Sequence, residues 1–121
     1  MVTKIDLVGW GKVIVNGKEY HQVLISQNQV FERKVDQLYQ QFGTTHQIAN
    51  WEEEILLEGD PEIILIANGF DGVLKVKEDF KNKVQAFGYQ LKVLKTPEAV
   101  GEYNRLVAEG KQVNALVHTT C

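Results

Sequence analysis

Cysteine, proline and long apolar runs are scarce in this chain of 121 residues, which holds one cysteine and two prolines. The single cysteine, Cys121, excludes an intramolecular disulfide and favours a reducing compartment. No apolar run approaches the roughly 20 residues that cross a bilayer. The opening segment MVTKIDLVGWGK does not have the pattern of a secretory signal. Together these absences predict a cytoplasmic protein.

The chain also has fewer basic than acidic residues. It contains 13 lysines and arginines and 16 aspartates and glutamates, which gives a net charge of −3. Non-specific binding to nucleic acid or to an anionic membrane requires a basic surface, so we expect neither partner. A content of 44% hydrophobic and 24% charged residues is ordinary for a globular protein. The length fits one domain over residues 1–121.

The first third of the chain has the pattern of β-structure. Asn16–Gly17 separates two β-rich segments, 12–15 and 18–25, and this dipeptide is the strongest short signal for a type I′ hairpin. The hairpin register places Val13 opposite Tyr20. These segments predict antiparallel strands or a small second layer.

Weaker signals flank that hairpin. Residues 5–8 and 30–33 are expected to be strands, with a bend or bulge at Gly9–Gly11 between the first strand and the hairpin. The polar segment 34–47 is interpreted as a loop with about one helical turn. Trp10, which lies between two glycines, is either a core residue or a surface anchor at an interface.

The second half alternates between helical and strand patterns. Helices are predicted near 48–58, 77–87 and 97–109, and apolar strand segments at 62–67, 89–94 and 113–118. Such alternation implies right-handed crossovers and a largely parallel central sheet covered by helices. The fold class is therefore α/β.

Capping residues set the expected helix starts. Asn50 followed by Glu53 has the character of a capping box. Thr96 stands where an N-cap hydroxyl is expected, and Pro97 follows at the first helical position.

A candidate binding site follows from the three predicted parallel strands. Ligands of open α/β sheets bind outside the carboxyl ends of the strands, and the following helix N-terminus would favour an anion there. The candidate ligand-binding residues are Asn68, Gly69, Thr96, His118 and Cys121. The alternative is that they are plain loop residues at strand ends.

Other chemistries fit the sequence less well. The segment 68–72, NGFDG, lacks the spacing of a dinucleotide fingerprint. A metal site needs three or four ligands, and His21, His46, His118 and Cys121 are scattered, so no metal is expected. A thiol nucleophile at Cys121 would need a base and an oxyanion site, and only His118 is available as a base. We therefore predict that the ending HTTC is structural, lines a shallow pocket at most, and packs Cys121 as a small hydrophobe.

The segment LKVLKTPEAVGEYNRLVAEGKQVNALVHTTC resembles the Mth-domain family. The resemblance rests on the threonine-led helix start, on Glu102–Asn104, and on the ending in which His118, Thr120 and Cys121 match the family pattern. It extends backward through the LIANG strand end and His46, and more weakly to the region of Trp10.

The sequence departs from that family at two places. Ala67–Gly69 stands where the family usually has Gly-x-Gly, which weakens any anion loop built on two glycines. Phe31 lies in a strand that often carries tryptophan in the family.

The resemblance implies a three-layer fold with a mixed, mostly parallel central sheet and an added N-terminal β-hairpin layer. It implies no established catalytic activity and no catalytic residue, and it favours an assembly or regulatory protein with protein partners. We expect no cofactor. We therefore expect a non-enzymatic interaction protein, with a homodimer through the N-terminal β layer as one arrangement. The alternative is a small anionic-ligand-binding protein or enzyme that uses a pocket around Asn68, Thr96 and His118.

Overall fold

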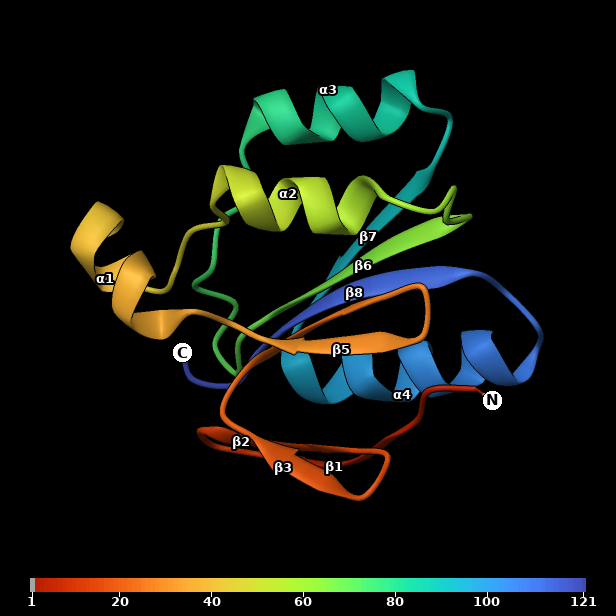
Figure 1. The fold of residues 1–121 in the computed structure, drawn as a ribbon, viewed down its shortest axis with the longest axis horizontal. Helices are drawn as coiled ribbons and strands as arrows, with labels where there is room; N and C mark the ends of the chain where they lie inside the picture. The colour runs from red at the N-terminus through yellow and green to blue at the C-terminus, as the bar shows by residue number, and fades with distance from the viewer. Residues whose placement is uncertain (1) are drawn as a thin grey trace.

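The computed structural model describes residues 2–121 and folds them into two β-sheets and four helices (Figure 1). The strands are β1 Ile5–Gly9, β2 Lys12–Val15, β3 Lys18–Tyr20, β4 Val23–Ser26, β5 Gln29–Glu32, β6 Ile63–Asn68, β7 Gln90–Leu94 and β8 Val113–His118. The helices are α1 Val35–Phe42, α2 Asn50–Leu57, α3 Glu78–Ala86 and α4 Thr96–Ala108. The predicted α/β class is confirmed.

The central sheet has five strands in the order β5-β4-β8-β6-β7. The pairings of β6 with β7 and with β8 are parallel, as predicted for the second half of the chain. The pairings of β4 with β5 and with β8 are antiparallel, so the sheet is mixed. The carboxyl ends of the three parallel strands therefore share one edge.

The small sheet has the order β1-β2-β3, and both of its pairings are antiparallel. Val13 pairs with Tyr20, which confirms the predicted hairpin register. The register of β1 shifts between Ile5 and Leu7. The chain turns at Trp10 rather than bulging there.

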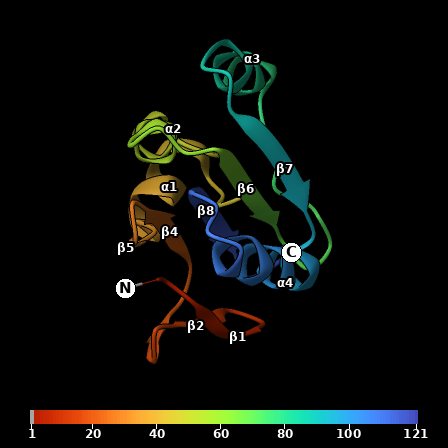
Figure 2. The ribbon, with the colours of Figure 1, turned by 90° about the vertical axis from the view of Figure 1, so that its right-hand side faces the viewer.

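Two hydrophobic cores lie on the two faces of the central sheet. Figure 2 shows the elements that cover these faces, with α2 and α3 on one side and α4 and the small sheet on the other. One core packs the sheet against α4 and against β1 and β2 of the small sheet. The other core packs the opposite face against α2 and α3. Alternate residues along β6 and β8 point into different cores, because a strand directs successive side chains to opposite faces.

Two predictions about the first third of the chain were wrong. Residues 18–25 are two strands, because the chain leaves the small sheet at His21 and enters the central sheet at Val23. The segment 34–47, interpreted as a loop with about one helical turn, contains the eight-residue helix α1. Leu38 is the buried anchor of that helix, which is otherwise polar on most of its surface.

The predicted helix starts are each displaced by one residue. In α2 the Glu52 carboxylate accepts a hydrogen bond from the Ala49 N–H group at 3.1 Å, so the capping interaction does not involve Asn50 and Glu53. In α4 the N-cap is Lys95, and the Thr96 hydroxyl makes contacts other than capping.

A helix that spans a membrane must be about 20 residues long and mostly apolar. Among residues 2–121, no helix is both long enough and apolar enough to cross a membrane.

Candidate functional site

The structure brings the predicted strand-end residues together at the carboxyl edge of β6, β7 and β8. Thr96 is fully buried there and links two strand ends. Its hydroxyl donates to the His118 carbonyl oxygen at 2.6 Å and accepts from the Gly69 N–H group at 2.9 Å. The Thr96 N–H group donates to the Gly69 carbonyl oxygen at 3.0 Å. The Thr96 hydroxyl therefore connects the end of β6 to the end of β8.

The segment Thr119–Cys121 lies outside this edge, against the loop that follows β6. The Phe70 N–H group donates to the Thr120 carbonyl oxygen at 2.8 Å, and the N–H groups of Asp71 and Val73 donate to the Cys121 oxygen at 2.9 and 3.1 Å. The loop after β6 thus wraps the tail with backbone hydrogen bonds, which keep the tail ordered.

Gly69 is the position at which loop and tail approach most closely. Its φ is +108°, and a Cβ atom there would lie 2.3 Å from the carbonyl carbon and oxygen of Cys121 and 3.0 Å from Cδ2 of His118. Only glycine fits this approach without displacing the tail. Gly69, one of the candidate ligand-binding residues, therefore allows the close packing of the chain on itself.

The start of α4 offers little to an anion. The first helical N–H group, that of Thr96, is used by Gly69, and the next residue, Pro97, has none. Asn68 is half-buried, and its Oδ1 atom has no hydrogen-bond partner in the described residues. Ligand binding by Asn68, Gly69, Thr96, His118 and Cys121 stays a prediction.

His118 is completely buried at the end of β8. Its Nδ1 atom lies 2.9 Å from Oε1 of Gln22, and its Nε2 atom lies 3.2 Å from the Thr120 hydroxyl. Arg33 donates to the same Gln22 oxygen at 2.8 Å. That oxygen is therefore an acceptor, and the proton of the imidazole is on Nδ1. Both groups that the His118 ring nitrogens contact are therefore side chains.

The surroundings of His118 keep its ring neutral. Burial, followed by the positive charge of Arg33 and then by His46 and His21, lowers the pKa of His118 from 6.5 to about 3. The His46 ring meets it edge-on with 5.2 Å between ring centroids. The ring is therefore neutral near pH 7, and each of its nitrogens lies within hydrogen-bond distance of a side chain.

The structure contains a buried ion pair near His118 that the sequence analysis did not predict. Arg33 Nε lies 2.6 Å from Oε2 of Glu52, and Arg33 Nη2 lies 2.9 Å from Oε1, with both side chains fully buried. Arg33 also donates to the backbone oxygens of Thr45 and Gln47. The helical spacing of Glu52 from buried Leu56 was the available signal, because it places that carboxylate on the apolar face.

Hydrogen bonds connect these groups into one chain of contacts. It runs from Glu52 through Arg33 and Gln22 to His118 and Thr120. It ties α2, the end of β5 and the β3–β4 turn to the end of β8. Groups satisfied in this way stabilise one arrangement of the elements.

Metal-binding side chains are dispersed in comparison. In the part of the chain that the structure describes, no three or more His, Cys, Asp or Glu residues come together as ligands for an ion. Cys121 is a free, half-exposed thiol, and His21 directs Nδ1 to the Gly11 carbonyl oxygen at 2.8 Å.

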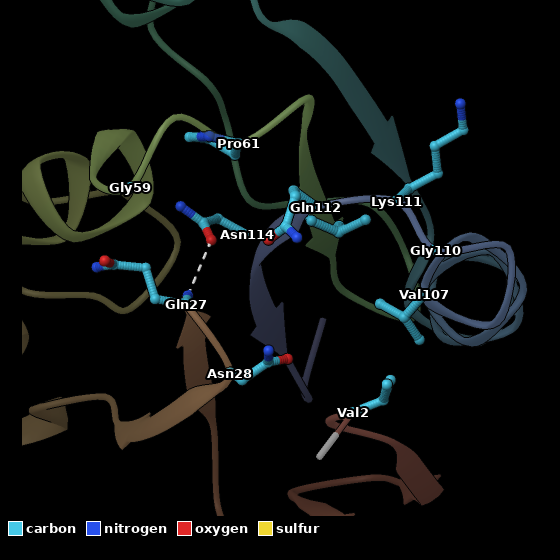
Figure 3. A pocket seen from close by; sticks show the side chains of 11 residues that line it. Val2, Gln27, Asn28, Gly59, Pro61, Val107, Gly110, Lys111, Gln112 and Asn114 are labelled. Carbon is cyan, nitrogen blue, oxygen red and sulfur yellow. Dashed lines mark hydrogen bonds between the residues drawn. The ribbon is translucent and has the colours of Figure 1, made fainter.

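A small cavity of about 200 Å³ lies at the opposite edge, near the start of β8 (Figure 3). Asn114 reaches this region from β8, and its amide is already satisfied. Oδ1 accepts from the Gln27 N–H group at 3.2 Å, and Nδ2 donates to the carbonyl oxygens of Leu56 and Glu58. Asn114 therefore ties the β4–β5 turn to the end of α2.

Comparisons with known proteins agree on the family. The family described as "Protein of unknown function (DUF498/DUF598)" matches residues 5–118. A solved structure called MT938 is 29% identical, with a TM-score of 0.76 and coverage of 98% of this chain and 99% of that one. The conserved hypothetical protein PH1505 of Pyrococcus horikoshii OT3 is 27% identical, with a TM-score of 0.83 and coverage of 98% and 99%.

A more distant structure supports the fold alone. A Bordetella pertussis protein described as an Mth938-like domain is 18% identical, with a TM-score of 0.64 and coverage of 97% of this chain and 85% of that one. The resemblance to the Mth-domain family is confirmed by these matches.

Proposed function

The chain belongs to the DUF498/DUF598 family of unknown function, and we propose that it is a non-enzymatic module that assembles with protein partners. The proposed contact surface surrounds Trp10, on the turn between β1 and β2.

The observation that carries this proposal is an exposed tryptophan in a fixed position. The Trp10 side chain is 61% exposed. Its ring lies 5.8 Å from that of Phe70, and the adjacent Gly11 N–H group donates to the Thr119 carbonyl oxygen at 2.7 Å. Exposed Leu7 lies on the same small sheet. A rigid, exposed tryptophan is the usual centre of a protein interface, because it buries a large area at little entropic cost.

The state of the reactive side chains also supports a binding role over catalysis. The pKa of His118 is lowered to about 3, so this buried ring is neutral near pH 7 and only a weak base, far from the pKa near the working pH that suits general-base catalysis. The hydroxyl of Thr96 is engaged both as donor and as acceptor. The tail occupies the edge at which a small ligand would be expected to bind.

The test compares two equally exposed aromatic residues. The full chain with an N-terminal tag is crosslinked and purified from its native host as wild type, Trp10→Ala and Phe87→Ala. Phe87 is 59% exposed at the C-cap of α3, the helix whose buried Phe80 and Val84 pack on the other face of the central sheet. We expect Trp10→Ala to lose about tenfold or more of each specific partner, as removal of an interface anchor does. Phe87→Ala should retain them, and equal recovery from all three proteins would refute the proposed surface.

A further inference from the structure

An apolar groove of about 400 Å³ runs between α2 and the edge strand β5. Phe31 of β5 and Trp51 and Ile55 of α2 line it, with Leu24 of β4 at its base. Phe31 is 39% exposed, and the two α2 residues are half-buried. The helix α2, which forms one wall of the groove, lies on the face of the sheet opposite to the small sheet that carries Trp10 (Figures 1 and 2).

Three carboxylates also line the groove, next to its apolar side chains. Glu54 and Glu58 follow Trp51 at helical spacing along the same flank of α2, and Glu32 lies at the end of β5. Lys34 is the single cation that lines the groove. Within residues 2–121, Glu54 and Glu58 take part in no ion pair, and Glu32 accepts only the His21 N–H group at 3.2 Å. The groove therefore has an excess of negative charge.

The strand that borders the groove has an open edge. β5 is the last strand of its sheet, paired only with β4. The Arg33 N–H group donates to the Gln22 carbonyl oxygen, which fixes the alternation along this antiparallel pair. The backbone N–H and C=O groups of Val30 and Glu32 consequently point away from β4. They form a short template on which another strand can pair.

We propose that the groove binds an extended basic peptide segment that pairs with β5 and places a large apolar side chain between Phe31 and Trp51. The proposal rests on the interaction role proposed above, but it uses a different surface. Backbone pairing on β5 supplies part of the affinity, and the apolar groove with its carboxylate rim selects the side chains. The excess of carboxylates over the single Lys34 favours lysine and arginine, and it disfavours an acidic partner.

The experiment uses a synthetic six-residue peptide in which lysine alternates with phenylalanine or valine, and an acidic counterpart with glutamate in place of lysine. The full chain carries Trp10→Phe, so that Trp51 is the only tryptophan and its fluorescence reports on the groove. We expect saturable binding of the basic peptide that weakens as salt is added, and no binding of the acidic one. No binding of the basic peptide, or equal binding of both, overturns the proposal.

Charge reversal on α2 tests the role of the rim. Glu54→Lys/Glu58→Lys is compared with Glu19→Lys/Glu98→Lys, which makes the same change in net charge at exposed positions outside the groove. Reversing two surface charges should weaken peptide binding about tenfold, and the control pair should change it far less. Equal weakening by both pairs would mean that only overall charge matters, and it would overturn the site.

A third variant tests strand pairing. Val30→Pro removes an N–H group on the open edge, where proline is tolerated, and circular dichroism checks that the variant is folded. Loss of peptide binding supports pairing on β5, whereas unchanged binding overturns it. A dimer that Glu54→Lys/Glu58→Lys dissolves would make a second copy of this chain the occupant and overturn the basic peptide. Because the Trp10→Phe background leaves α2 and β5 intact, failure of the Trp10 surface and failure of the groove are separate results.

Discussion

Arg33 and Glu52 form a two-point ion pair that is completely buried between the end of β5 and α2, with nitrogen–oxygen distances of 2.6 and 2.9 Å. Neither charge has solvent to compensate for the loss of its partner. The pair is the centre of the network that reaches His118 through Gln22.

Breaking that pair from one side should strongly destabilise the protein. We expect Arg33→Met or Glu52→Met alone to lower the free energy of unfolding by about 3–5 kcal/mol, because each leaves an uncompensated buried charge. The double variant should lose less than the sum of the two single losses. Urea unfolding of the four proteins measures this coupling, and strictly additive losses would contradict it.

Stability should fall in mild acid because of His118. The pKa of His118 is about 3 in the fold and 6.5 as a free side chain. Between these values the unfolded chain binds the proton and the folded chain does not. The contribution of the neutral ring is therefore fully present above pH 6.5, and as the pH falls toward 3 about 1.4 kcal/mol is lost per pH unit.

His118→Asn is the matched variant, because asparagine retains a donor near Nδ1 and does not titrate in this range. Unfolding by urea at intervals between pH 4 and pH 7 should give a shallower loss of stability for His118→Asn than for wild type, because one titrating group is removed. Identical slopes for the two proteins would disprove the assignment to His118.

Gly69→Ala should disrupt the tail. The new Cβ atom would lie 2.3 Å from the Cys121 backbone at a φ of +108°, so we expect a loss of about 2–5 kcal/mol from strain and overlap together. Gly88→Ala is the control, because Gly88 also has a positive φ, of +79°, but nothing lies within 4 Å of its Cβ position. That control should cost only about 1–2 kcal/mol, and equal losses in thermal or urea unfolding would argue against the close approach.

Thr96 should matter for its hydroxyl rather than for its shape. Thr96→Val would leave the Gly69 N–H group and the His118 carbonyl oxygen without this partner, at a cost of about 2–4 kcal/mol. Thr96→Ser keeps both hydrogen bonds and should lose about 1 kcal/mol for the missing methyl group. If valine were tolerated as well as serine in urea unfolding, the bridging role would be wrong.

The small sheet should mediate self-association. Leu7 and Ile14 are paired on the outer face of this sheet, with Leu7 51% exposed, and β3 is an edge strand that pairs only with β2. We expect a dimer that forms as concentration rises in sedimentation velocity and that Leu7→Lys weakens. Phe87→Lys, at an equally exposed position elsewhere, should leave it unchanged. A wild-type protein that stays monomeric at high concentration would contradict this.

Several elements were predictable from local sequence. The hairpin at Asn16–Gly17 has a turn that only a few residue types allow, and its register follows from the turn. The helix α4 has proline near its start, an apolar face that includes Tyr103, and Gly110 just beyond its end. The convergence of Asn68, Thr96 and His118 was predictable because parallel strands place their carboxyl ends at one edge.

Other elements carry too weak a local signal. In α1 one residue, Leu38, is buried, so the helical period is hard to recognise in a polar segment. The break at His21 lies within a continuous β-rich run, and only the existence of two sheets separates β3 from β4.

The sequence by itself determined the order of most elements and the edge at which the candidate residues meet, since caps, turns and periodicity are local properties. The tertiary structure decided what those residues do. Arg33 finds Glu52 across 19 positions and His118 finds Gln22 across 96, contacts that no local pattern encodes. The tail fills the edge because Gly69 lets the Cys121 backbone approach, and such packing depends on both segments being in place at once.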